Sequence, residues 1–161
     1  MSMDHPATAL VLDFLAAVGV PVAETAFEGD SFLPGMRVRR GILEIDPARP
    51  FYPGDLLHEA GHIAVTDPAL RSNLDEVADD PAEEMAAIAW SYAAAVAIGL
   101  DPAILFHEHG YKGGGQALID AFATGGDLGV PMLEWYGLTS CARNVERTGR
   151  PAFPVMTRWL R

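Results

Sequence analysis

Apolar residues recur at helical spacing in several stretches of the chain, and segments rich in glycine and proline separate these stretches. The first stretch, residues 7–20, is expected to form a core helix, because its apolar residues follow the helical period and Gly19 provides a stop. It is interrupted by Asp13 and preceded by Asp4, so we expect neither a membrane span nor a signal peptide. Further helices are expected at about residues 54–66, 81–98, 102–110 and 116–123, and a polar loop is expected at residues 67–79.

Two strands are expected upstream of the second helix. Residues 42–45 are rich in isoleucine and leucine and are typical of a strand, and Arg40-Gly41 just before them indicates a turn or a bulge. Residues 22–27 form the other candidate strand. Because helices outnumber strands, the pattern predicts an α+β fold that is mostly helical and contains a small β-sheet.

The length of 161 residues suits one domain, which we expect to extend over residues 1–161. Hydrophobic residues make up 50% of the chain, which is enough to fill a core without a disulfide or a structural metal. The formal net charge of -11 argues against a nucleic-acid-binding protein, and the densest basic group, Arg37, Arg39 and Arg40, is too small for a binding stripe. A single cysteine, Cys141, cannot form an internal disulfide and fits a cytoplasmic location.

The most specific motif is the sequence HEAGH at residues 58–62, within the second expected helix. Its spacing places His58 and His62 one turn apart on one helix face, where two imidazole nitrogens reach one tetrahedral metal ion. Glu59 lies beside them, and a carboxylate there can take a proton from a water molecule that the metal activates. The alternative is a pair of core histidines that satisfy each other or backbone groups.

A third metal ligand is expected, because a catalytic zinc site holds its ion with three protein ligands and an open position. In the third helix Asp80 suits the N-cap and Pro81 the first position, so Glu83 falls where its side chain can cap the helix. Glu84 has no such role and begins a helix face that can be buried, so we select Glu84 as the ligand and keep Glu83 in reserve. Otherwise both are solvated acids that the helix dipole favours. Gly61 in the motif indicates close packing against such a helix.

His107 and Tyr111 are further candidates for a catalytic role, because either side chain can stabilise an oxyanion. The plainer interpretation places His107 at a helix C-terminus, where histidine complements the dipole. The glycines at residues 113–115 lack the Lys-Ser/Thr ending of a phosphate-binding loop and mark a hinge or a plain loop. The apolar residues at 132–138 suggest a contact in a homodimer.

The motif at residues 58–62, followed one helix later by Glu84, resembles the gluzincin branch of metallopeptidases. The short chain, the strand just upstream and the alanine-rich helix after Glu84 are more similar to the small zincin-like peptidases that accompany bacterial and phage regulators. The resemblance covers roughly residues 38–98.

This resemblance implies a zincin-like fold and a zinc ion held by His58, His62 and Glu84, with Glu59 as the general base. It also implies that residues 42–45 form the edge strand that lines the substrate cleft. The leading hypothesis is therefore a metal-dependent hydrolase that acts on a peptide or protein. One alternative is a non-catalytic zincin-fold regulator that acts through partner contacts, and another is an iron oxygenase with the same ligands.

Overall fold

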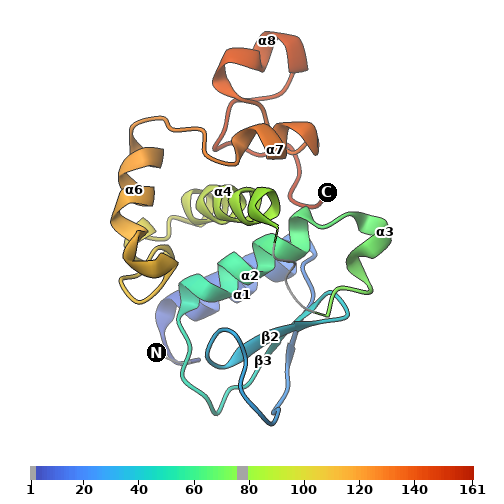
Figure 1. Cartoon of the computed structure of the whole chain (residues 1–161), viewed down its shortest axis with the longest axis vertical. Coiled ribbons are helices and arrows are strands. Elements are labelled where there is room, and N and C mark those ends of the chain that lie inside the picture. Colours follow the sequence, from blue (N-terminus) through green and yellow to red (C-terminus); the bar gives the residue numbers. More distant parts are fainter. Residues whose placement is uncertain (1–2, 76–79) are drawn as a thin grey trace.

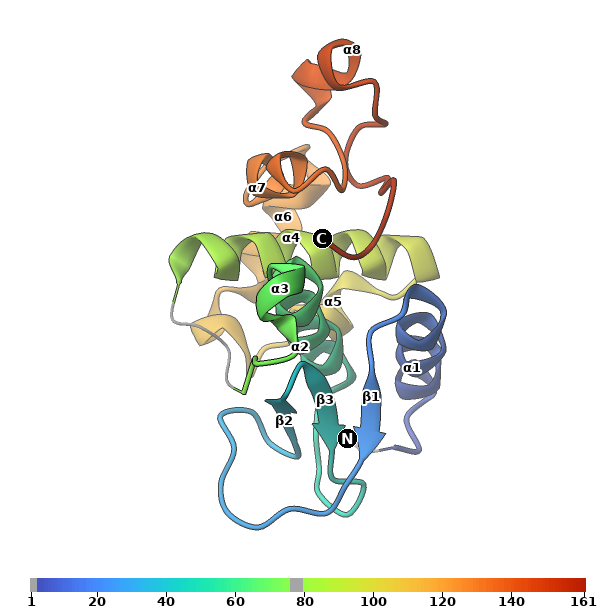
Figure 2. The ribbon, with the colours of Figure 1, turned by 90° about the vertical axis from the view of Figure 1, so that its right-hand side faces the viewer.

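The computed structural model describes residues 3–75 and 80–161, and its elements form the α+β fold that the sequence predicts. Helix α2 (Pro53–Val65) lies between the β-sheet and helix α4 (Pro81–Ile98), which crosses over it (Figures 1 and 2). Helix α1 (Pro6–Val18) packs against α2 and against the first strand of the sheet. Shorter helical elements are α3 (Pro68–Arg71), α5 (Pro102–Leu105), η1 (Tyr111–Gly113), α6 (Gly115–Ala123), α7 (Val130–Trp135), η2 (Ala142–Asn144) and α8 (Val145–Thr148).

The sheet has the strand order β1-β3-β2 and consists of β1 (Val22–Glu24), β2 (Met36–Arg39) and β3 (Ile42–Ile45). Strand β1 runs parallel to β3, whereas β2 runs antiparallel to it. Arg39 pairs with Ile42, so Arg40 and Gly41 close a hairpin with φ angles of 52° and 70°. Positive φ at both central residues is the geometry that a two-residue hairpin favours, which confirms the expected turn.

The position of β3 corrects one expectation. Residues 42–45 are not the edge strand that the resemblance implies, because β3 is the central strand and β1 and β2 form the two edges. The tight turn folds residues 36–39 back onto β3 and covers the edge that β3 would otherwise expose. The free edge on the side where α4 begins is therefore β2 (Figure 2).

Helix α1 has the boundaries that its pattern predicts. It ends where Gly19 adopts a left-handed φ of 85°, and His5 caps its start by accepting a hydrogen bond from Ala7 N at 3.1 Å. Val11 and Leu15 are completely buried on its inner face. Within the described residues, no helix is long and apolar enough to cross a membrane.

Helix α2 is buried along its whole length, and two glycines allow neighbouring helices to approach its backbone. A Cβ atom at Gly61 would lie 2.9 Å from the carbonyl oxygen of Ala87 in α4. One at Gly54 would collide with the carbonyl oxygen of Ile104 in α5. A side chain at either position would push the neighbouring helix away. The expectation that Gly61 marks close packing is confirmed, and its neighbour is the helix that supplies the candidate third ligand.

Three helices begin with the same Asp-Pro sequence. The carboxylates of Asp67, Asp80 and Asp101 each accept a hydrogen bond of 2.9 Å from the backbone N–H two residues later. Proline at the first helical position has no N–H to leave unsatisfied, so this sequence starts α3, α4 and α5 cleanly. Helix α3 therefore occupies part of the segment 67–79 that was expected to be a loop, of which residues 76–79 lie outside the described residues.

The helix expected at residues 102–110 is wrong in its length, because α5 ends at Leu105. The chain turns back at Phe106, and the backbone of Gly115, where α6 begins, lies against the Phe106 carbonyl group. This contact requires the chain to leave the helical path after one turn. His107 consequently lies in a loop and not at a helix C-terminus.

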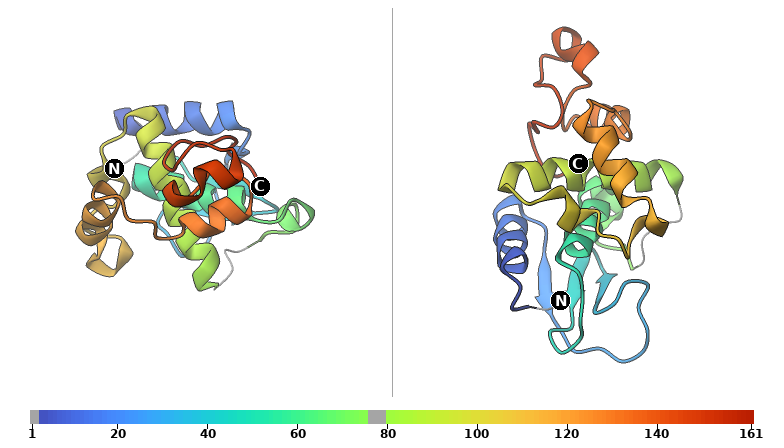
Figure 3. Two further views of the ribbon diagram at one scale, coloured as in Figure 1. Left: turned by 90° about the horizontal axis from the view of Figure 1, so that it is seen from above. Right: turned by 90° about the vertical axis from the view of Figure 1, so that its left-hand side faces the viewer.

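Residues 129–161 had little pattern in the sequence, and polar contacts organise them. The Glu134 carboxylate accepts hydrogen bonds from Cys141 N at 2.7 Å, Asn144 Nδ2 at 2.9 Å and Arg147 Nη2 at 2.6 Å. Burial raises the pKa of Cys141, and the nearby Glu134 carboxylate adds to this effect, so its thiol stays protonated. The segment around α8 projects beyond α4, and the end of the chain then returns to the central helices (Figure 3).

We predict that Trp90→Ala destabilises the protein by about 3–5 kcal/mol. Trp90 is completely buried in α4. Its ring is tilted against Phe14 and meets Trp159 edge-on, and its indole N–H donates a hydrogen bond of 2.8 Å to the Trp159 carbonyl. Phe32→Ala is the control, because Phe32 is 99% exposed and its loss should change stability by less than about 0.5 kcal/mol. Urea unfolding of both variants measures the difference, and equal losses would contradict this packing.

Candidate metal centre

Three side chains from two helices converge on one point. His58 and His62 project from α2, and Glu84 projects from the first turn of α4. The two Nε2 atoms are 3.2 Å apart, His62 Nε2 is 3.0 Å from Glu84 Oε2, and His58 Nε2 is 3.4 Å from Glu84 Oε1. The close approach of α4 to Gly61 brings the carboxylate within reach of both imidazoles.

The 3.2 Å separation of the two Nε2 atoms fits a tetrahedral metal ion, and the Glu84 carboxylate presents a different oxygen to each imidazole. Two ligand atoms that each lie 2.0–2.1 Å from a tetrahedral zinc ion are about 3.3 Å apart. Hydrogen bonding among the three groups accounts for the distances less well, since each Nε2 carries at most one proton. If both imidazoles donate a hydrogen bond to Glu84, their two N–H groups are forced close together, which is unfavourable. If instead one imidazole donates its Nε2 proton to the other, one of the two contacts with Glu84 has no proton for a hydrogen bond. A cation at the centre satisfies all three groups together.

The cluster is closed on one side and open on the other. His62 is 1% exposed and His58 is 8% exposed, whereas the side chain of Glu84 is 45% exposed. An ion held by these groups would be backed by the buried helix pair and reached by solvent on the Glu84 side. Three protein ligands and an open position are characteristic of catalytic zinc sites.

Glu83 occupies a different place from Glu84. Its Oε1 atom lies 3.6 Å from His62 Nδ1, on the opposite side of the ring from Glu84. Asp80, and not Glu83, provides the observed cap of α4, so the expected capping role does not explain where Glu83 points. A carboxylate behind a ligating imidazole orients the ring and strengthens it as a ligand. The structure thus places Glu84 with the two Nε2 atoms and Glu83 in a supporting position.

The carboxylates control the protonation of the histidines in the metal-free protein. Burial lowers the pKa of His62, but Glu83 and Glu84 outweigh burial and raise it to about 9. His58 and His62 in turn hold the pKa of Glu84 well below its ordinary range. At neutral pH His62 is therefore in its positively charged form, with a proton on both ring nitrogens. A metal ion has to displace the proton on Nε2 in order to bind.

Glu59 is buried next to the cluster, at 7% exposure. Burial raises the pKa of its carboxyl group, and the nearby His58 and His62 oppose this effect. A carboxylate that gains and loses a proton at a pH closer to neutral is better suited to general base and acid catalysis. The burial and raised pKa of Glu59 suit this chemistry, and its role as a proton carrier stays a prediction.

The structure separates the two other predicted residues. The ring of Tyr111 meets the ring of His58 edge-on at a centroid distance of 5.5 Å, and within residues 3–75 and 80–161 its buried hydroxyl has no hydrogen-bond partner. His107 stays outside the three-residue cluster, and its Nε2 atom is 2.8 Å from Asp55 Oδ1. Asp55 was not among the residues predicted from the sequence. Its position three residues before His58 on the same helix face was the available signal.

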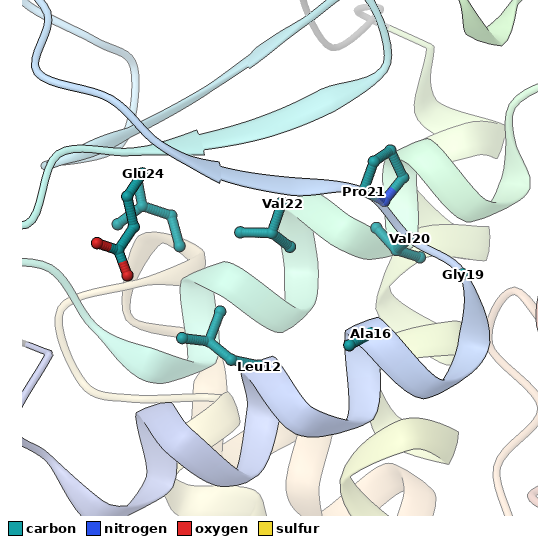
Figure 4. A pocket seen from close by; sticks show the side chains of 8 residues that line it. Leu12, Ala16, Gly19, Val20, Pro21, Val22 and Glu24 are labelled. Carbon is teal, nitrogen blue, oxygen red and sulfur yellow. The ribbon is translucent and has the colours of Figure 1, made fainter.

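A hollow of the described surface lies elsewhere, between α1 and β1 (Figure 4). Its volume is about 450 Å³, and apolar side chains such as Leu12 and Val22 line most of it, with Glu24 at one end. None of the predicted site residues lines this hollow. It has no set of groups that could hold a metal or activate a nucleophile, so the chemistry of the chain points to the helix pair.

We predict that the metal-free protein loses stability as the pH rises from about 6.5 to about 9. The pKa of folded His62 lies above its ordinary value of 6.5, so its contribution to stability is complete below that value and disappears near pH 9. The loss should be at most about 3 kcal/mol. Thermal unfolding in the presence of a chelator measures it, and His62→Gln should flatten the pH dependence. A wild-type melting temperature that stays constant over this range would contradict the charge arrangement.

Comparisons of the chain with protein-family models, with curated proteins and with solved structures gave no match. The function therefore has to be inferred from the site itself. That site is a pair of helical histidines and a glutamate whose ligand atoms lie within 4.8 Å of one another, with a buried carboxylate, Glu59, beside it.

Proposed function

We propose that the chain is a zinc-dependent hydrolase that cleaves peptide bonds. The observation that carries this proposal is the convergence of His58 Nε2, His62 Nε2 and the Glu84 carboxylate, with Glu59 buried next to them. Two imidazoles and one carboxylate form a donor set that zinc uses in catalytic sites, although other divalent transition metals bind the same groups. The HEAGH sequence and the resemblance to gluzincins support the peptidase assignment.

A zinc ion held here supplies a Lewis acid that acidifies a water molecule and polarises a substrate carbonyl group. Glu59 accepts the proton of the attacking water molecule and returns it to the leaving amine. Burial of Glu59 favours this exchange because it brings the pKa of the acid closer to neutral pH. The Tyr111 hydroxyl, which has no hydrogen-bond partner among the described residues, is available to donate a hydrogen bond to the carbonyl oxygen as negative charge develops.

The openness of the cluster favours a catalytic role over a structural one. Structural zinc sites are closed by four protein ligands, whereas the cluster in the described part of the chain contains three. The core around α2 and α4 is filled by buried apolar side chains such as Leu57, Ile63 and Trp90, so the fold does not need a metal as a staple.

We predict about one zinc ion per chain in protein purified without a histidine tag. His58→Ala and Glu84→Ala should each weaken zinc binding by at least about 100-fold, because each removes a ligand. Glu83→Ala should keep the stoichiometry and weaken binding by only about 10-fold, since Glu83 contacts His62 Nδ1. Elemental analysis and competition with a chelator test this. The exposed His109→Ala is the control, and a wild type that binds no added zinc would refute the proposal.

We predict that Glu59→Gln lowers the hydrolysis of fluorescently labelled casein by about 100-fold or more, while the zinc content is unchanged. The substitution keeps the size of the side chain and removes its ability to take a proton. If zinc-loaded wild type and Glu59→Gln are equally inactive, the chain is a metal-binding regulator. If they are equally active, Glu59 is not the base.

A further inference from the structure

Asp55 is a buried acid whose position metal binding does not explain. It lies in the first turn of α2, one turn before Glu59, and is 5% exposed. Its carboxylate accepts a hydrogen bond of 2.8 Å from His107 Nε2, a residue 52 positions away in the sequence. This bond ties the loop after α5 directly to the helix that carries both histidine ligands.

His107 is held from several sides. Its ring stacks on Tyr52 with a centroid distance of 4.1 Å and an interplanar angle of 14°. The backbone of Gly110 packs on the ring, since a Cβ atom there would lie 3.2 Å from His107 Nε2. Together with Asp55, these contacts fix the start of the loop with little freedom to move.

The loop after His107 is closed by its own hydrogen bonds. Gly110 N donates to His107 O at 3.1 Å, Gly113 N donates to Gly110 O at 3.0 Å, and Gly114 N donates to Tyr111 O at 2.9 Å. Tyr111 itself has a φ of 53°, a left-handed conformation that is unfavourable for a bulky residue. Such a conformation persists only where the surroundings impose it, and it is frequent at functional sites.

The Tyr111 side chain lies against a proposed metal ligand. Its ring contacts the rings of His58 and Phe106 edge-on, with centroid distances of 5.5 Å and 5.1 Å. Among the described residues, its buried hydroxyl has no hydrogen-bond partner, which is costly for a group that phenylalanine would replace without loss of packing. A tyrosine hydroxyl carries its proton at neutral pH, so it is available as a donor.

We propose that the Asp55–His107 pair is a positioning device, which holds the loop so that the Tyr111 hydroxyl donates a hydrogen bond to an oxygen atom of the ligand bound at the metal centre. His107 then acts through Tyr111 and does not touch the ligand. This inference rests on the proposed zinc site, but not on whether the protein turns over a peptide. It assigns to Asp55 a role in ligand affinity, whereas a buried acid with a purely structural role would affect only the stability of the fold.

The test uses the full chain loaded with zinc and acetohydroxamate, a small chelator whose oxygen atoms bind the metal and accept hydrogen bonds. Calorimetry measures its affinity for wild type, Tyr111→Phe, Asp55→Asn, His107→Gln and the double variant Tyr111→Phe/Asp55→Asn. Tyr111→Phe should weaken binding by about 10- to 100-fold, the value of one hydrogen bond to a charged group. Asp55→Asn and His107→Gln should each weaken it by about 3- to 10-fold.

The double variant is decisive, because residues that act through one another are not additive. It should bind acetohydroxamate as weakly as Tyr111→Phe alone, while all variants keep the zinc affinity of the wild type. His109→Ala, an exposed residue of the same loop, should change nothing. Additive losses, or wild-type affinity in both Asp55→Asn and His107→Gln, would overturn the positioning role. Unchanged affinity in Tyr111→Phe would overturn the hydroxyl as a donor.

Two further results separate this inference from the proposed function. Zinc binding and a Tyr111-dependent affinity without casein hydrolysis would refute the hydrolase but support the positioning device. Failure of the wild type to bind zinc would overturn both. Because Asp55→Asn removes a buried charge partner, circular dichroism checks its fold, and His107→Gln breaks the same pair from the other side.

Discussion

The candidate metal centre depends on the contact between the backbones of α2 and α4. Gly61 has no side chain, so the Ala87 carbonyl of α4 comes closer to α2 than a methyl group at this position would allow. Glu84 lies one turn before Ala87 on the same helix and is therefore brought to His58 and His62. Gly61 has no reactive group, yet its small size allows the three ligands to meet.

A second constraint is the excess of negative charge around the two histidines. In the described part of the chain, the ion pairs of Asp55, Glu83 and Glu84 involve histidines and neither arginine nor lysine. In the metal-free protein, protonation of His62 compensates part of this negative charge. A bound divalent cation would compensate more of it, because it would neutralise two carboxylates and leave the imidazoles free to act as ligands. The protein as a whole, with a formal charge of -11, also favours the approach of cations.

Local signals in the sequence predicted the main helices well. The apolar period and Gly19 defined α1, the Asp-Pro caps defined the starts of α4 and α5, and the strand at residues 42–45 was placed at its observed boundaries. The expected strand at residues 22–27 is shorter, since β1 ends at Glu24. The expectations that failed depended on distant contacts. The rank of β3 in the sheet follows from the pairing of other strands, and the end of α5 follows from a contact with Gly115.

The same distinction applies to the site. The spacing of His58 and His62 follows from helix geometry, and capping explained enough of α4 to single out Glu84, although Glu83 itself points to His62 and not to the cap. The pair of Asp55 and His107 was beyond reach, because 52 positions separate them and no local rule brings them together. An acid in the first turn of a helix is ordinarily explained by the helix dipole, which concealed its actual partner.

The half-exposed side chain of Glu84 has a consequence for how the site would exchange its ion. The two histidines belong to a helix pair that is held together by its own apolar packing, so a metal can leave without opening the core. The Glu84 side chain, the ligand on the solvent side, can change its rotamer to release the ion and change back to bind another. The occupancy of the metal site would then depend on the concentration of free metal around the folded protein. It would not depend on which metal was present when the chain first folded.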